Sequence, residues 1–159
     1  MKVNDMYTEE DRLNLFRNEC RSYDWYISEI RRLEDKLTVI KTKMEHLSSP
    51  AMDRVGSNPN QGQMSDLVSL IEEKNRIENR KTALKELTDW IRECIDRISY
   101  PAYRMVVWDT MVKGGKLSVL ANTYDVSEKL LSKNRRKCLL LVLDRNTMES
   151  YERIRTGIK

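Results

Sequence analysis

A basic segment at positions 127–137 (SEKLLSKNRRK) holds the residues whose types and spacing could most directly do chemistry. Its five Lys and Arg residues against one Glu give it a net charge of +4, which equals the net charge of the entire 159-residue chain. The remainder of the chain is therefore electrically balanced. Because a local positive charge on an otherwise neutral protein attracts polyanions, this segment predicts a nucleic-acid surface.

The residues before the basic segment fit the first helix and the turn of a helix-turn-helix. Three apolar residues at helical spacing would line one side of a helix over 117–124, namely Leu117, Leu120 and Tyr124. Ala121 is small, as a close crossing of two helices requires. Asp125 is one of the few residue types other than Gly that tolerate a positive φ. Val126 would plug the turn, and Ser127 would cap the second helix.

The second helix, expected over 127–143, would turn most of its basic side chains away from the core. A helical wheel centred on Leu131 places Ser127, Cys138 and Val142 inward. Three cations fall on the opposite face: Lys129, Lys133 and Arg136. Asn134 and Arg135 lie toward the core side, so we do not expect them to read bases.

Basic and small polar side chains on the first turns of such a helix suit the major groove of double-stranded DNA. Lys and Arg can donate to guanine or to phosphate oxygens, and Ser can contact either. The predicted DNA-binding residues are Ser127, Glu128, Lys129, Ser132, Lys133, Arg136 and Lys137. Within this set, Lys129, Ser132 and Lys133 would read bases, whereas Arg136 and Lys137 would anchor phosphates.

The elements that must position this segment are expected to be helical. Charged residues make up 34% of the chain, with only five Gly and three Pro, a composition typical of an all-α protein. Apolar residues three and four apart predict one long helix over about 9–47: Tyr23, Tyr26, Ile30, Leu33, Leu37, Ile40, Met44 and Leu47. A second long helix would start at the cap Ser65-Asp66. It carries an apolar residue every seven positions: Leu70, Ile77, Leu84, Ile91 and Ile98.

A 17-residue stretch over 48–64, rich in Pro, Gly, Ser, Asn and Gln, separates the two long helices and predicts a flexible loop. The helices would fold back on each other as an antiparallel coiled-coil hairpin. Alternatively, each apolar seam would pair with another chain and make a homodimer. The predicted organisation is a helical hairpin over 1–99, followed by a helix-turn-helix domain with a C-terminal tail over 100–159.

The C-terminal domain would begin with a helix over about 101–113, because Pro101 suits a first helical position. Gly114-Gly115 would end that helix. The tail over 144–159 would hold one more short helix, starting near Asn146.

Residues for catalysis or metal binding are sparse. His46 is the only histidine, and the three cysteines, Cys20, Cys94 and Cys138, match no metal-ligand spacing. No Gly-rich phosphate loop or nucleophile motif occurs, so we expect neither an enzyme nor a cofactor nor a metal site. No run approaches the roughly 20 apolar residues of a membrane span, so we expect no membrane partner and a location in the cytoplasm of whatever cell makes the chain.

One aromatic residue lies off the apolar seam. Trp25, between Tyr23 and Tyr26, would be exposed on a simple hairpin and could form a partner site with Tyr7 and Phe16. The alternative is that the C-terminal domain folds back and covers it. The apolar run 138–143 should be covered on more than one side.

Residues 101–143 resemble a sigma-factor region-4-type helix-turn-helix, in PAYRMVVWDTMVKGG and in KLSVLANTYDVSEKLLSKNRRKCLLLVL. The order of helices, the Ser49-Pro50 loop and the Ser65-Asp66-Leu67 start resemble small phage transcriptional regulators of the ArpU/RinA type. This resemblance implies a regulator of phage late or packaging genes that contacts host RNA polymerase.

We therefore expect a DNA-binding phage transcriptional regulator. Its hairpin would serve for oligomerisation or for contact with RNA polymerase. Two alternatives stay open. One is a phage terminase small subunit for DNA packaging, which a ring oligomer would favour. The other is a coiled-coil adaptor or inhibitor whose helix-turn-helix binds protein only.

Overall fold

The computed structural model describes residues 7–48 and 61–158, and these ranges consist of helices and short connections with no strand. The elements in chain order are α2 (Glu9–Ser48), α3 (Gln61–Asp96), α4 (Pro101–Val107), the π-helical turn η1 (Trp108–Val112), α5 (Leu117–Thr123), α6 (Glu128–Val142) and α7 (Arg145–Ile158). The expected all-α class is therefore confirmed.

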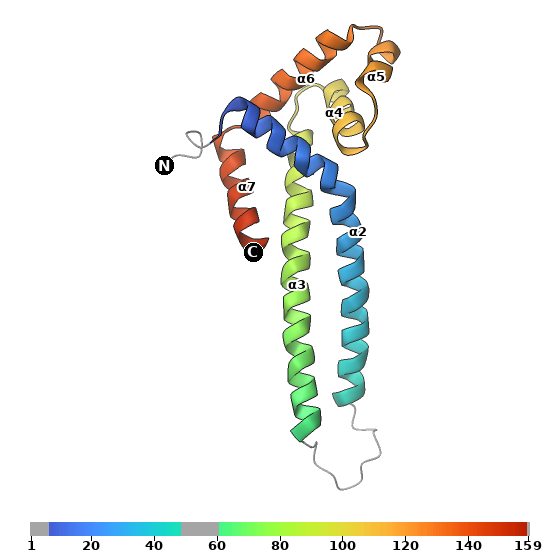
Figure 1. Cartoon of the computed structure of the whole chain (residues 1–159), viewed down its shortest axis with the longest axis vertical. Coiled ribbons are helices and arrows are strands. Elements are labelled where there is room, and N and C mark those ends of the chain that lie inside the picture. The colour runs from blue at the N-terminus through green and yellow to red at the C-terminus, as the bar shows by residue number, and fades with distance from the viewer. Residues whose placement is uncertain (1–6, 49–60, 159) are drawn as a thin grey trace.

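The two long helices, α2 and α3, lie side by side and run in opposite directions (Figure 1). At about 1.5 Å per residue, the 40 residues of α2 extend about 60 Å. The apolar seam of α2 is buried from Tyr23 to Ile40, and Met44 and Leu47 at its far end are half-buried. On α3 the seam is buried at Leu84, Ile91 and Ile98.

The start of α3 differs from the sequence prediction. The helix begins at Gln61, four residues before the expected cap at Ser65. Gln and Met have good helix propensity, so a single Gly62 does not stop the helix there. The expected flexible loop over 48–64 is therefore too long at its C-terminal end, and residues 49–60 lie outside the described ranges.

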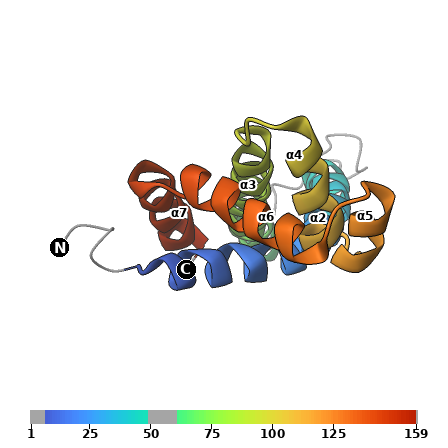
Figure 2. The ribbon, with the colours of Figure 1, turned by 90° about the horizontal axis from the view of Figure 1, so that it is seen from above.

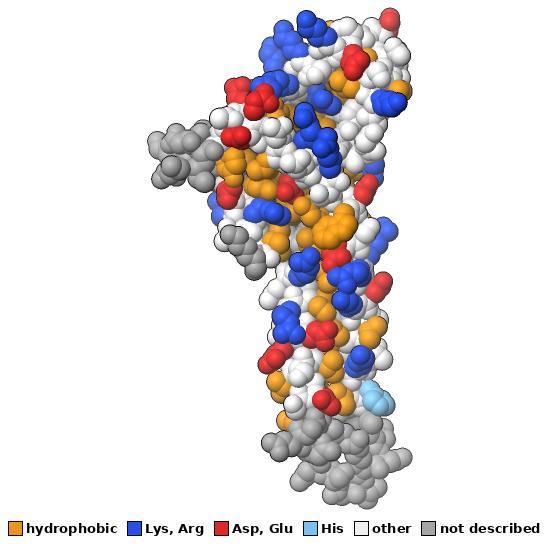
Figure 3. All heavy atoms as spheres, in the orientation of Figure 1, with side chains coloured by type: hydrophobic (Ala, Val, Ile, Leu, Met, Phe, Trp, Pro, Cys, Tyr) orange, Lys and Arg blue, Asp and Glu red, His pale blue; other side chains and the backbone are white. Residues whose placement is uncertain are grey.

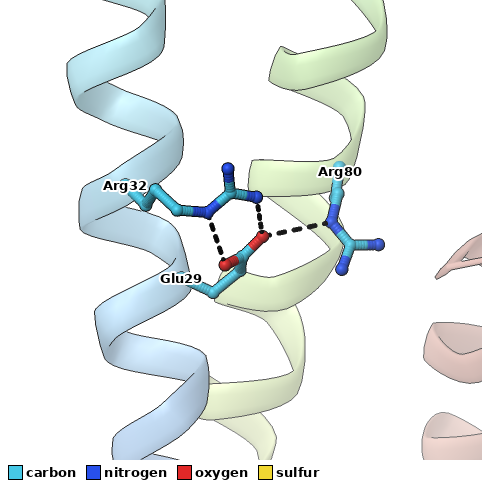
Figure 4. Close-up of polar contacts among 3 residues, drawn as sticks. All are labelled: Glu29, Arg32 and Arg80. Atoms are coloured by element: carbon cyan, nitrogen blue, oxygen red, sulfur yellow. Dashed lines mark hydrogen bonds and ion pairs between the residues drawn. The ribbon is translucent and has the colours of Figure 1, made fainter.

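A buried carboxylate links the two long helices midway along their contact (Figure 4). Glu29 on α2 is only 8% exposed. It accepts two hydrogen bonds from the guanidinium of Arg32, one of them from Nε at 2.8 Å, and Arg80 Nε of α3 lies 3.7 Å from Oε1. The hydrogen bonds from Arg32 lower the pKa of Glu29, so the carboxylate stays charged and fixes the register of the pair.

The C-terminal helix α7 packs back against α3 (Figure 1). It is longer than expected, because Asp144 caps it by accepting from the Thr147 backbone N–H at 2.9 Å. Trp90 of α3 fills the contact. Its indole N–H donates to the Thr147 carbonyl at 3.1 Å, and its ring lies 4.8 Å from that of Tyr151.

A second buried carboxylate joins α7 to α2. Glu19 is 8% exposed and accepts hydrogen bonds from the hydroxyls of Tyr26 at 2.7 Å and Tyr151 at 2.8 Å. Both phenols are held protonated, because burial and the neighbouring carboxylate raise their pKa values, that of Tyr26 to about 12. One continuous core therefore includes the α2–α3 pair, α7 and the end of α6.

Trp25 is exposed as predicted, with 54% of its surface accessible, but Tyr7 and Phe16 do not form an exposed site with it. Phe16 is fully buried, edge-on to Trp90 at 5.9 Å between ring centres. Tyr7 is half-buried, and its hydroxyl bonds Glu152 of α7. The C-terminal part of the chain thus covers Phe16 and Tyr7 and leaves Trp25 exposed.

The apolar end of α6 is covered on most sides, as expected. Leu139, Val142 and Leu143 are buried in the main core. The expectation fails for Leu141, which is 80% exposed because its side of α6 faces away from both α2 and α7.

Candidate nucleic-acid interface

The turn between α5 and α6 is the tight connection that the sequence predicts. Asp125 has φ of +53°, so it takes the left-handed conformation that Asp tolerates better than most residues. The Val126 backbone N–H donates to the Ala121 carbonyl at 3.0 Å and closes the turn. Ser127 caps α6 as expected, since its Oγ accepts from the Leu130 backbone N–H at 3.1 Å.

A small apolar cluster holds α5 against α6. Ala121, Leu131 and Val106 of α4 are buried together, with Leu117, Leu120 and Tyr103 partly buried around them. Ala121 thus takes the close-crossing position that its size predicts. Two predictions are wrong: Val126 is 38% exposed rather than plugging the turn, and Tyr124 is 40% exposed. Neither side chain belongs to the buried cluster, which Val106, Ala121 and Leu131 form.

The helix α6 crosses the top of the molecule, between α4 on one side and the N-terminal half of α2 on the other (Figure 2). Its outward residues include most of the predicted DNA-binding set. Ser127, Glu128, Lys129, Lys133 and Lys137 are exposed, and Ser132 and Arg136 are partly buried. Figure 3 shows Lys and Arg side chains gathered at this upper end of the molecule. Six of the seven predicted residues therefore lie in α6 and the seventh, Ser127, is its N-cap; three lysines of the set, Lys129, Lys133 and Lys137, are exposed.

Arg136 differs from the free phosphate anchor that the sequence suggests. Its guanidinium pairs with Glu10 of α2 at 2.5 Å and with Glu9 at 3.7 Å. Both carboxylates are exposed, so this pairing contributes little stability and a competing anion can replace it. The sequence does not predict this pairing, because nothing local shows that α2 begins beside α6.

Asn134 and Arg135 lie on the core side of α6, where the wheel places them, whereas Ser127, which the wheel also places inward, is exposed at the N-cap. Asn134 donates to the Tyr103 hydroxyl at 2.8 Å, and Arg135 donates to Thr110 Oγ1 at 2.9 Å. Burial, and then the nearby positive charge of Arg17, lower the pKa of Arg135. These two side chains position α6 against α4 and η1 and do not reach its outward face.

Three basic residues that sequence reasoning missed lie beside α6. Arg17 and Arg21 of α2 and Lys113 after η1 line a cleft of about 450 Å³ together with Arg135. Lys113 also pairs with Asp24 at 3.1 Å and lies 5.5 Å from the centre of the Trp108 ring. No sequence pattern links α2 to the Gly114-Gly115 turn, so only the fold reveals this cluster.

The His, Cys, Asp and Glu residues of the described structure include the side chains that could bind a metal ion or act as a cysteine nucleophile. Within the described ranges, no three His, Cys, Asp or Glu residues are placed to hold a metal ion. Burial raises the pKa of the Cys20, Cys94 and Cys138 thiols, which keeps them protonated and poorly nucleophilic. None of the described helices has both the length and the hydropathy needed to cross a membrane.

Comparison of the chain with protein-family models, with curated proteins and with solved structures finds no match.

Proposed function

We propose that this protein is a sequence-specific DNA-binding transcriptional regulator, with α5 and α6 acting as a helix-turn-helix. The observation that carries the proposal is the capped α6, which presents Lys129, Lys133 and Lys137 on one open face. The left-handed Asp125 turn and the buried Ala121 support it, because they give α5 and α6 the close crossing of a groove-reading pair.

In this proposal, α6 enters the major groove with its N-terminal turns. Lys129, Ser132 and Lys133 contact base edges, and Lys137 binds a phosphate. Ser127 and Glu128, in the first turn, lie at the floor of the groove. Arg136 exchanges its exposed pairing with Glu10 for a backbone phosphate when DNA docks.

The hairpin provides the partner surface of the proposed regulator. Its described part leaves several large apolar side chains exposed: Trp25, Val39, Met64, Val68 and Ile71. Among them Trp25 is of a residue type that is enriched at the energetic anchors of protein interfaces. A second copy of the chain or host RNA polymerase is the proposed partner. Two resemblances support the proposal of a phage regulator: that of residues 101–143 to a sigma region-4 helix-turn-helix, and that of the order of helices to regulators of the ArpU/RinA type.

The test is a fluorescence-anisotropy titration of the full chain against duplex fragments of its own genome. We expect Lys133→Ala to weaken a specific complex by about 5- to 150-fold, as loss of a base contact does. The matched control is Lys36→Ala, which removes the same charge from an exposed site on the hairpin. Equal effects of the two variants would contradict base reading by α6 and favour the adaptor role.

Oligomeric state separates the regulator from the packaging alternative. Sedimentation of the full chain as a monomer or dimer is expected for the regulator. A closed ring of many copies would instead indicate a terminase small subunit.

A further inference from the structure

The cleft beside α6 is lined by four cations and, among the described residues, by no carboxylate. Arg17 and Arg21 come from successive turns of α2, Lys113 from the end of η1 and Arg135 from α6. Three parts of the chain that are distant in sequence thus bring four positive side chains to one volume of about 450 Å³.

The cations of the cleft are short of counter-charge. Within the described part of the chain, neither Arg17 nor Arg21 forms an ion pair, and Arg135 is partly buried on a neutral hydroxyl, that of Thr110. Crowding like charges in a partly desolvated place costs free energy unless an anion offsets it. Lys113 alone has a carboxylate partner, Asp24, on the outer side of the cleft.

Two glycines, Gly114 and Gly115, line the edge of the cleft. Gly114 has φ of +74°, and a Cβ on Gly115 would lie 2.9 Å from the Asp109 carbonyl oxygen. The Gly115 N–H donates to that same oxygen at 2.7 Å. Gly114 therefore has a backbone conformation that favours glycine, and at Gly115 a side chain would clash with the Asp109 carbonyl.

The basic surface of the cleft continues to the outward face of α6. A smaller cavity of about 110 Å³ shares Arg17 and Arg135 with the cleft and is also lined by Ser132 and Arg136. Basic residues therefore line a continuous surface that runs from Arg136 on α6, past Arg135, to Arg17 on α2.

We propose that this cleft is a phosphate-binding site, in which Arg17, Arg21 and Arg135 donate charge-assisted hydrogen bonds to phosphoryl oxygens. Guanidinium groups match this chemistry because their planar N–H pairs fit two oxygens at once. The phosphate comes either from the backbone of a duplex lying on α6 or from a free polyphosphate. The site stands on its own geometry and does not require the proposed transcriptional function.

The first arm of the test is calorimetric titration of the full chain with inorganic pyrophosphate. We expect one saturable site, weakened about tenfold by Arg17→Gln. The control, Arg31→Gln, removes an exposed arginine from the same helix, away from the cleft. Equal urea midpoints of the two variants show that both fold, and Arg17 is suited to this because its side chain is exposed.

The second arm measures the salt dependence of duplex binding by the same variants. If the bound phosphate belongs to the DNA backbone, Arg17→Gln should make the negative slope of log K against log salt shallower by about 0.9, and Arg31→Gln should leave it unchanged. A free-polyphosphate source predicts a loss in the pyrophosphate arm only. If the protein binds no duplex, the proposed DNA-binding function is wrong. The pyrophosphate titration then still shows whether the cleft binds phosphate. The site is overturned if Arg17→Gln matches Arg31→Gln in every arm that shows binding, or if neither anion binds.

Discussion

Replacing Tyr151 with Phe should loosen the contact of α7 with α2, because it removes one of two hydrogen bonds to a buried carboxylate. Glu19 is 8% exposed and accepts only from Tyr26 at 2.7 Å and Tyr151 at 2.8 Å among the described residues. A hydrogen bond to a charged group contributes about 1.5–3 kcal/mol to stability. We therefore expect Tyr151→Phe to lower the free energy of unfolding by about 2 kcal/mol.

Urea unfolding followed by circular dichroism measures this change, with the denaturant slope expected to stay constant. Tyr100→Phe is the matched control, since Tyr100 is 66% exposed and its hydroxyl bonds no described residue. Its expected effect is within about 0.5 kcal/mol, as for most surface substitutions. A Tyr151→Phe loss no larger than that of the control would refute the assigned role of Glu19.

Three further predictions concern the same carboxylate and the α5–α6 turn. Because its pKa is raised to about 12, Tyr26 contributes stability that is complete below pH 10 and is lost as pH rises toward 12. Unfolding free energies of wild type and Tyr26→Phe should therefore converge in this range, and a constant gap would contradict the assignment. At φ of +53°, Asp125→Gly should be more stable than Asp125→Ala by about 1 kcal/mol in thermal unfolding, and equal midpoints would argue against the turn. Ser127→Ala should cost about 1 kcal/mol through loss of the α6 cap, whereas Ser118→Ala on exposed α5 surface should be neutral.

Local pattern was enough to predict much of the helical structure. The seam of α2, the Ser127 cap and the positive φ of Asp125 all follow from the spacing and intrinsic preferences of neighbouring residues. The inward placement of Asn134 and Arg135 follows from helical periodicity alone. These features depend on interactions within a few residues, which a sequence displays directly.

Features made by distant contacts could not be predicted in the same way. The pairing of Arg136 with Glu10 and the convergence of Arg17 on Arg135 each join α2 to α6, more than a hundred residues apart. The Val126 prediction was wrong because the buried cluster between α5 and α6 includes Val106 of the more distant α4 and leaves Val126 exposed. Which side chain fills a shared volume is decided by packing, and pattern alone does not specify it.

The central claim is that the outward face of α6 contacts DNA. The most direct test removes the same number of positive charges from α6 in one variant and from the hairpin in another. One variant replaces Lys129, Lys133 and Lys137 of α6 with Gln, and its control replaces three exposed hairpin lysines, Lys36, Lys41 and Lys43. Both lose three positive charges. The account predicts that the α6 variant weakens specific duplex binding more than about tenfold, through the base contacts of Lys129 and Lys133, and reduces the magnitude of the salt-dependence slope by about 0.9, through the phosphate contact of Lys137, while the hairpin variant keeps the wild-type slope. Equal slopes for the two variants would contradict it.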